Sequence, residues 1–187
     1  METCCGQAFG AAQYSLLGLV LQCAQALCLL IAAPAAAAWA AGAMGPLLLW
    51  LGQPPETAAA AGRLLQLTWP VLPLLAISET TGQYLLAQGV AAPASVTGLL
   101  QLAAAAPAFW LLVQWLGWLR GVAAAQVALQ LLAATFVTSW RVIRDRRVSR
   151  SDPDRATWHG FTLESLKGLP SYTRFAVPAA CMVCLEW

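Results

Sequence analysis

Long uncharged stretches dominate the pattern of this chain. No charged residue lies between Glu2 and Glu56, between Glu79 and Arg120, or between Arg120 and Arg141. A membrane-spanning helix needs about 20 mainly apolar residues, so each of these gaps is long enough to cross a bilayer. We expect four full spans and the start of a fifth, at about residues 16–42, 63–87, 93–116, 122–143 and from 171 onward.

Proline and glycine mark where these spans bend or end. Pro34 lies inside the first span, where we expect a kink, because neighbouring groups in a membrane can satisfy the carbonyl that proline frees. Turn-forming residues between Gly45 and Glu56 predict a connecting segment, whose 47–50 part would lie at the membrane interface with Trp50. Residues 89–93 and 117–121 predict two further short links.

Composition supports a membrane protein. Hydrophobic residues make up 60% of the chain and charged residues only 10%, against about a quarter charged in ordinary soluble domains. We therefore predict an all-α, multi-pass integral membrane protein that is surrounded by the lipid bilayer.

Arginine is concentrated in one stretch. Six of the ten basic residues are Arg141, Arg144, Arg146, Arg147, Arg150 and Arg155. Such a cluster is normally retained on the cytoplasmic side, so we expect residues 144–160 to form a cytoplasmic basic loop. Nucleic-acid binding fits less well, because the stretch is short, lies between spans and is partly offset by three aspartates. An amphipathic segment, residues 161–168, would follow on the membrane surface.

Neither a metal site nor an intramembrane enzyme is indicated. The six cysteines lie in or beside apolar segments, and a zinc site would need more ligands than these and His159, the single histidine. We interpret them as small buried apolar residues. An intramembrane serine protease would need a histidine within a span, and the HExxH pattern of metalloproteases is absent. We expect no cofactor, no metal and no catalytic residue.

Two acidic residues lie within apolar segments, and such residues usually mark an ion or substrate path. Glu186 lies in the apolar run 175–187, although it could instead be a charge at a water-exposed terminus. Glu79, beside Thr80 and Thr81, could line a cavity or form hydrogen bonds to neighbouring helices. Gln88, at the following turn, is a candidate cavity-lining residue or a structural partner for exposed backbone groups.

Four segments together resemble the eukaryotic branch of the multidrug and toxin extrusion (MATE) transporter family. The resemblance covers nearly the whole chain and keeps the order and spacing of the family's motifs. The segments are METCCGQAFGA at residues 1–11, similar to the family's ETLCGQAFGA; GQPPE at 52–56; QYLLAQGVAAP at 83–93; and TWHGFTLESLK at 157–167 with FAVPAACMVCLEW at 175–187.

The resemblance implies an antiporter of twelve helices in two halves, which exports organic cations, xenobiotics or secondary metabolites against protons. It also implies that Glu186 matches the family's proton-coupling acid, since such a carboxyl can be neutral in one state and charged in another. Residues 1–143 would form the end of the second helix to the sixth, residues 144–170 the cytoplasmic linker, and residues 171–187 the start of the seventh helix.

The sequence also departs from the family pattern. Ala12 stands where a lysine is common, and the first helix, most of the second and everything after the start of the seventh are not matched. We therefore expect a fragment of an antiporter, in a plasma membrane or a vacuolar-type membrane. The alternative is a non-transporting truncated membrane protein that acts as a structural or assembly module.

Overall fold

The structure, a computed structural model, describes residues 2–152, 157, 172–174 and 176–178. Within this part of the chain the elements are helices, and none of the described residues forms a strand. The helices with their bounds are α1 (Glu2–Gly10), α2 (Tyr14–Ala40), α3 (Met44–Trp50), α4 (Pro55–Thr68), α5 (Val71–Ala87), α6 (Ala92–Leu116) and α7 (Trp118–Ser151). The predicted all-α fold is confirmed.

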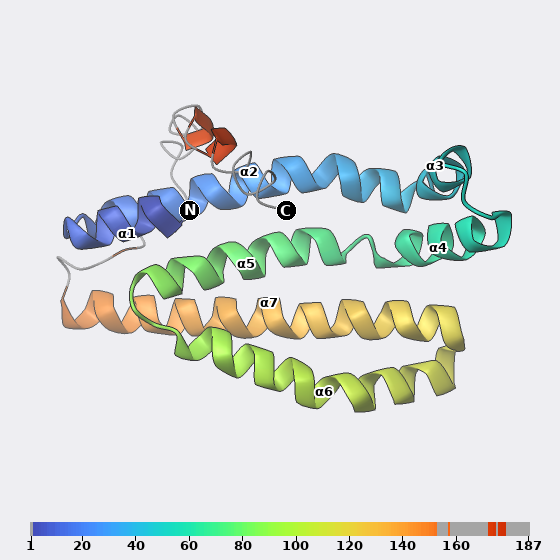
Figure 1. Cartoon of the computed structure of the whole chain (residues 1–187). Coiled ribbons are helices and arrows are strands. Elements are labelled where there is room, and N and C mark those ends of the chain that lie inside the picture. The colour runs from blue at the N-terminus through green and yellow to red at the C-terminus, as the bar shows by residue number, and fades with distance from the viewer. Residues whose placement is uncertain (1, 153–156, 158–171, 175, 179–187) are drawn as a thin grey trace.

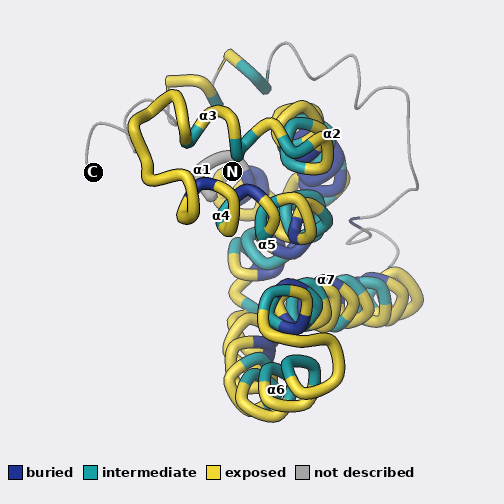
Figure 2. The backbone as a smooth tube through the Cα atoms, turned by 90° about the vertical axis from the view of Figure 1, so that its right-hand side faces the viewer, coloured by how far each residue is buried: buried dark blue, intermediate teal, exposed yellow. Residues whose placement is uncertain are grey.

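The long helices lie side by side as a bundle. In Figure 1, α2, α5, α7 and α6 follow one another across the molecule, while α1 lies at one end and α3 and α4 at the other. α5 packs against both α2 and α7, and α6 packs against α7. A buried hydrophobic cluster joins α1 to the long helices and includes Leu17, Leu21, Tyr84, Leu85 and Val137. Figure 2 shows that buried residues are concentrated on α2, α5 and α7, whereas α6 is largely exposed.

Three described helices are long and apolar enough to cross a membrane, namely α2, α6 and α7. The pair α4 and α5 passes the same test when taken as one span with a bend of 56°. This agrees with the prediction of four spans, and α2 continues through Pro34 as a single helix.

The second predicted span needs correction. We expected one helix over residues 63–87, but helical structure begins at Pro55 and breaks after Thr68 before it resumes at Val71. Pro70 and Pro73 explain the break, because proline has no backbone N–H to donate and its ring clashes with the preceding turn.

Two predicted connections are also shorter than expected, whereas the segment predicted between Gly45 and Glu56 contains a short helix, since residues 47–50 belong to α3. The link predicted over 117–121 consists of Gly117 alone, whose φ of +80° suits glycine. The basic loop predicted from residue 144 is helical as far as Ser151, since arginine is a good helix former. The amphipathic segment 161–168 lies outside the described residues.

The bundle has two chemically different ends. The uncharged part of α7 between Arg120 and Arg141 is about 30 Å long, which equals the thickness of the hydrocarbon core. We call the end with residues 141–151 of α7, the α5–α6 turn and α1 the arginine end. The opposite end carries the exposed Trp50, Trp115 and Trp118, as expected for an interfacial aromatic belt.

Candidate functional site

A hydrogen bond between α5 and α7 defines the depth of the candidate site. Gln130 donates through Nε2 to Ser78 Oγ at 2.9 Å. Gln130 lies midway along the uncharged part of α7, about 15 Å of helix from each flanking arginine. Ser78 and its neighbour Glu79 therefore lie near the middle of the apolar thickness.

Glu79 points away from the packed interior of the bundle. Its neighbours Ser78, Thr80 and Thr81 are buried, whereas Glu79 is exposed. Thr80 and Thr81 donate to carbonyls of their own helix, and Gln25 of α2 donates to Thr81 Oγ1 at 3.2 Å. These hydrogen bonds place the hydroxyl-bearing residues in the helix contacts and leave Glu79 on an open face.

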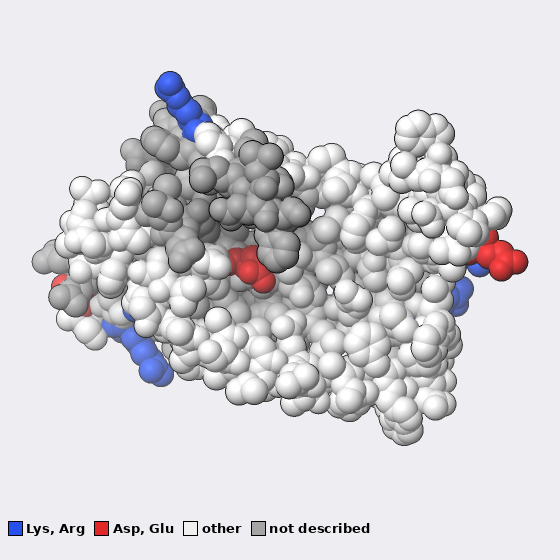
Figure 3. All heavy atoms as spheres, in the orientation of Figure 1, with Lys and Arg blue, Asp and Glu red and all other residues white. Residues whose placement is uncertain are grey.

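The surroundings of Glu79 carry little other charge. Figure 3 shows acidic atoms near the middle of this face, and the described residues coloured as charged otherwise lie toward its ends. Glu79 is the acidic residue of α5. Within the described part of the chain it forms no hydrogen bond to a neighbouring helix, so the carboxylate is accessible to water or to a ligand.

Gln88 lies at a different depth from Glu79. It follows the last residue of α5, about 14 Å of helix from Glu79, and is buried at the arginine end. Its Nε2 donates to the Tyr84 carbonyl at 3.3 Å, and its Oε1 accepts a hydrogen bond from Nη1 of Arg144. Gln88 thus joins the end of α5 to α7 through the side chain of Arg144.

A buried polar cluster at the arginine end was missed by sequence reasoning. The Tyr84 hydroxyl donates to Thr157 Oγ1 at 2.7 Å, and the Thr157 hydroxyl donates to Asp145 Oδ1 at 3.3 Å. Arg141 Nε lies 3.9 Å from Asp145 Oδ2. The sequence showed Arg141 and Asp145 only as charges of a basic loop, although their spacing of four residues suits one helix face.

This cluster is suited to holding structure together. A buried carboxylate is costly unless it is paired and hydrogen-bonded, and here two hydroxyls and a guanidinium surround it. The cluster connects α5, α7 and the segment that follows α7. We call Tyr84, Arg141, Asp145 and Thr157 the Asp145 cluster.

Other sequence-predicted site features have different outcomes. Glu186 and His159 lie outside the described residues, so the proposed role of Glu186 stays a prediction. Of the described cysteines, Cys5 and Cys23 are buried, as predicted, whereas Cys28 is only partly buried. Among the described residues no group of three or more histidine, cysteine, aspartate or glutamate side chains is arranged to hold a metal ion.

Comparison with known proteins identifies a family model and several relatives that match this chain. The family model MatE matches residues 1–111 of the chain. Protein DETOXIFICATION 48 of Arabidopsis thaliana is 34% identical over 187 residues, a match that covers 100% of this chain and 34% of the relative. Protein DETOXIFICATION 49 of the same plant is 31% identical over 188 residues, with coverage of 100% and 36%.

A solved structure shares the fold as well. The crystal structure of the eukaryotic MATE transporter AtDTX14 superposes with a TM-score of 0.84 at 26% identity, over 100% of this chain and 40% of that one. The chain spans about a third of the length of the curated relatives named above. The predicted partial MATE-type bundle is thus confirmed, and this multi-pass integral membrane protein belongs to the MatE family of multidrug and toxin extrusion transporters.

Proposed function

We propose that this chain forms part of a proton-coupled antiporter that exports organic cations, xenobiotics or secondary metabolites. The observation that carries the proposal is the exposed carboxylate of Glu79 near the middle of the apolar thickness. A carboxylate at that depth is costly in lipid, so it faces a water-filled cavity or a partner and marks an ion or substrate path. Membership of a transporter family supports the same interpretation.

The broken span formed by α4 and α5 supports a site at this depth. Secondary transporters bind substrates and coupling ions near the bilayer midplane, at helices that are interrupted. Here the bend of 56° lies at Trp69–Pro70, and Glu79 follows within the second half of the broken span. Such a break allows one half of a span to move relative to the other during alternating access.

Two carboxylates have different proposed roles. Glu186, the match to the family's coupling acid, exchanges protons, while Glu79 lines the cavity and attracts a cationic substrate. The ionised form of either group favours a bound cation, and protonation weakens that attraction. Residues 1–143 belong to the N-terminal half of the transporter, and residues 171–187 begin the C-terminal half.

The arginine end is proposed to face the cytoplasm. Its described part carries Arg141, Arg144, Arg146, Arg147 and Arg150, against Arg63 and Arg120 at the opposite end. Retention of the more basic end on the cytoplasmic side then gives the orientation.

A chimera tests the proposal. This chain would replace the segment that it matches in AtDTX14, and the product would be reconstituted in liposomes with an acidic interior. We expect uptake of the fluorescent cation ethidium, and we expect it to collapse when the pH gradient is dissipated. Glu186→Gln should abolish the dependence on the gradient, and Glu79→Gln should weaken uptake. Glu56→Gln, at an exposed position in the first turn of α4 near the opposite end, is the matched control.

The outcomes separate the competing interpretations. Uptake that is indifferent to the pH gradient in the unsubstituted chimera would contradict proton coupling. A chimera that is folded, as judged by its helical circular dichroism and gel-filtration profile, but moves no ethidium would contradict transport. That second result would favour the alternative, a structural or assembly module.

A further inference from the structure

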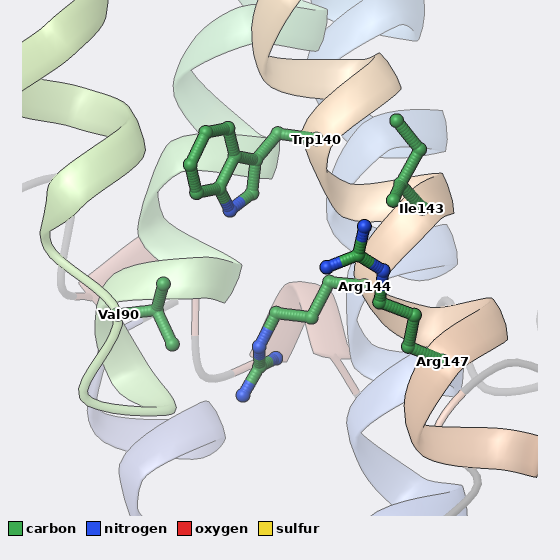
Figure 4. Close-up of a pocket in the computed structure, with 5 residues that line it drawn as sticks. All are labelled: Val90, Trp140, Ile143, Arg144 and Arg147. Carbon is green, nitrogen blue, oxygen red and sulfur yellow. The ribbon is translucent and has the colours of Figure 1, made fainter.

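A pocket at the arginine end combines two positive charges with an apolar wall. Its volume is about 470 Å³, and the described residues that line it are Val90, Trp140, Ile143, Arg144 and Arg147. Figure 4 shows the side chains of Trp140 and Arg144 extending from α7 toward Val90 of the α5–α6 turn. None of these lining residues is acidic, so the pocket attracts anions.

The residues that line the pocket change from apolar to basic along the bilayer normal, from the membrane interior outward. Trp140 is the last residue of the uncharged part of α7 and Ile143 follows in the next turn, while Arg144 and Arg147 lie about one helical turn beyond Trp140 and Ile143. Trp140 is 39% exposed and Ile143 is 53% exposed, so their apolar surfaces are available to a ligand. Tryptophan prefers this depth, the boundary between hydrocarbon and headgroups.

Arg144 is held in position by the protein. Its Nη1 donates to Gln88 Oε1, and Gln88 is itself fixed by its hydrogen bond to the Tyr84 carbonyl. A guanidinium has five N–H donors, and this contact uses one of them. The remaining donors suit the oxygens of a phosphate, which guanidinium groups bind in a fork geometry.

The nearest acidic residue on α7 does not neutralise this pocket. Asp145 belongs to the Asp145 cluster, where it accepts a hydrogen bond from the Thr157 hydroxyl and faces the guanidinium of Arg141. It lines a different hollow, together with Arg141, Arg146 and Arg150. Asp145 interacts electrostatically with Arg144, but it does not line the pocket, where the two guanidinium groups of Arg144 and Arg147 outnumber this one carboxylate.

We propose that this pocket binds an anionic glycerophospholipid. The phosphate lies between Arg144 and Arg147, and an acyl chain runs inward along Ile143, Trp140 and Val90. A soluble anion would use the arginines but not the apolar wall, and an uncharged lipid would use the wall but not the arginines. Basic pockets between membrane helices are known to hold anionic headgroups. The site is separate from the midplane position of Glu79, and it does not depend on transport.

Binding is tested on the purified chain in detergent by native mass spectrometry. Phosphatidylglycerol and phosphatidylcholine are added at equal concentration, with inorganic phosphate as a separate competitor. We expect phosphatidylglycerol to bind about fivefold more tightly, and Arg147→Gln to remove about that factor. The matched control is Arg146→Gln, which removes the same charge from an exposed neighbour that lines the other hollow.

Each result decides the proposal. Equal binding of the two lipids, or an equal loss with Arg146→Gln, would overturn it. Displacement of the lipid by inorganic phosphate at similar concentration would assign the pocket to a soluble anion and overturn the lipid assignment. As a second measurement, phosphatidylglycerol with brominated acyl chains should quench more fluorescence in the unsubstituted chain than in Trp140→Phe. Equal quenching would contradict the predicted path of the acyl chain.

Discussion

The hydroxyl of Tyr84 donates a 2.7 Å hydrogen bond to the hydroxyl of Thr157, a residue 73 positions later in the chain. Tyr84 is fully buried and Thr157 nearly so. The hydroxyl of Thr157 in turn donates a hydrogen bond to Oδ1 of Asp145 in α7. The segment after α7 is thereby anchored to the end of α5, at the arginine end of the bundle.

Removal of the Tyr84 hydroxyl should loosen this anchor. Tyr84→Phe keeps the ring in the core but removes the donor to the Thr157 hydroxyl oxygen, so we expect the free energy of unfolding to fall by about 1 kcal/mol. Unfolding in mixed detergent micelles, followed by circular dichroism, measures the change. A double-mutant cycle with Thr157→Val should give a coupling energy of similar size.

Thr135→Val supplies the control for that cycle. The Thr135 hydroxyl bonds only to carbonyls of its own helix among the described contacts, those of Leu131 and Leu132. The loss of unfolding free energy caused by Thr135→Val should therefore add to the loss caused by Tyr84→Phe, with no coupling energy between the two. Strict additivity between Tyr84→Phe and Thr157→Val would show that the two hydroxyls do not interact.

The Asp145 cluster also illustrates what sequence patterns leave out. Arg141 and Asp145 are four residues apart on one helix, but their partner Tyr84 lies 61 positions before Asp145, and no periodicity connects them. The pairing arises from the packing of α5 against α7. By contrast, the unusual position of Glu79 was visible at once, because a charge in an apolar run stands out without any tertiary information.

The proline residues show a second feature that sequence patterns alone do not predict, namely where a helix breaks. The charge-free runs correctly predicted α2, α6 and α7 as spanning helices. Yet Pro34 and Pro107 lie inside continuous helices, whereas Pro70 lies at a break. The residue type alone does not distinguish these cases, since a proline is tolerated when surrounding groups satisfy the carbonyl that it frees. The nearby Pro73 adds a second missing donor within one turn, which favours the break.

The contact between α6 and α7 should depend on Gly121. A Cβ at this position would lie 2.5 Å from Val113 Cα and 2.6 Å from the Leu112 carbonyl oxygen, both backbone atoms of α6. Gly121→Ala therefore forces the two helices apart, and we expect a loss of about 1–3 kcal/mol in the free energy of unfolding. Unfolding in mixed micelles again provides the measurement.

Gly98→Ala is the matched control for Gly121→Ala. A Cβ at Gly98 would meet nothing within 4 Å, so this change should be neutral or stabilising by up to about 1 kcal/mol through helix propensity. If the two substitutions change stability equally, close backbone approach is not what holds α6 and α7 together.

The bend between α4 and α5 should straighten when its prolines are replaced. Pro70→Ala with Pro73→Ala restores two backbone N–H groups, which can donate to the carbonyls of Gln66 and Trp69. Straightening a bend of 56° lengthens the distance between spin labels at Thr57 and Leu86 by about 5 Å. Double electron–electron resonance measures the distance between the two spin labels. Pro107→Ala in α6 should leave it unchanged, and an unaltered distance in the double variant would mean that packing, rather than proline, sets the bend.

Water access to Glu79 distinguishes a cavity from a lipid-facing surface. In a background without native cysteines, Glu79→Cys should react with a membrane-impermeant thiol reagent, because the reactive thiolate forms in water and is suppressed in apolar surroundings. Leu102→Cys is the control, since Leu102 is a 75% exposed residue of the apolar helix α6. We expect the thiol at position 79 to react at least about tenfold faster. Equal, slow reaction at both positions would place Glu79 against lipid and remove the main support for a transport cavity on this face of α5.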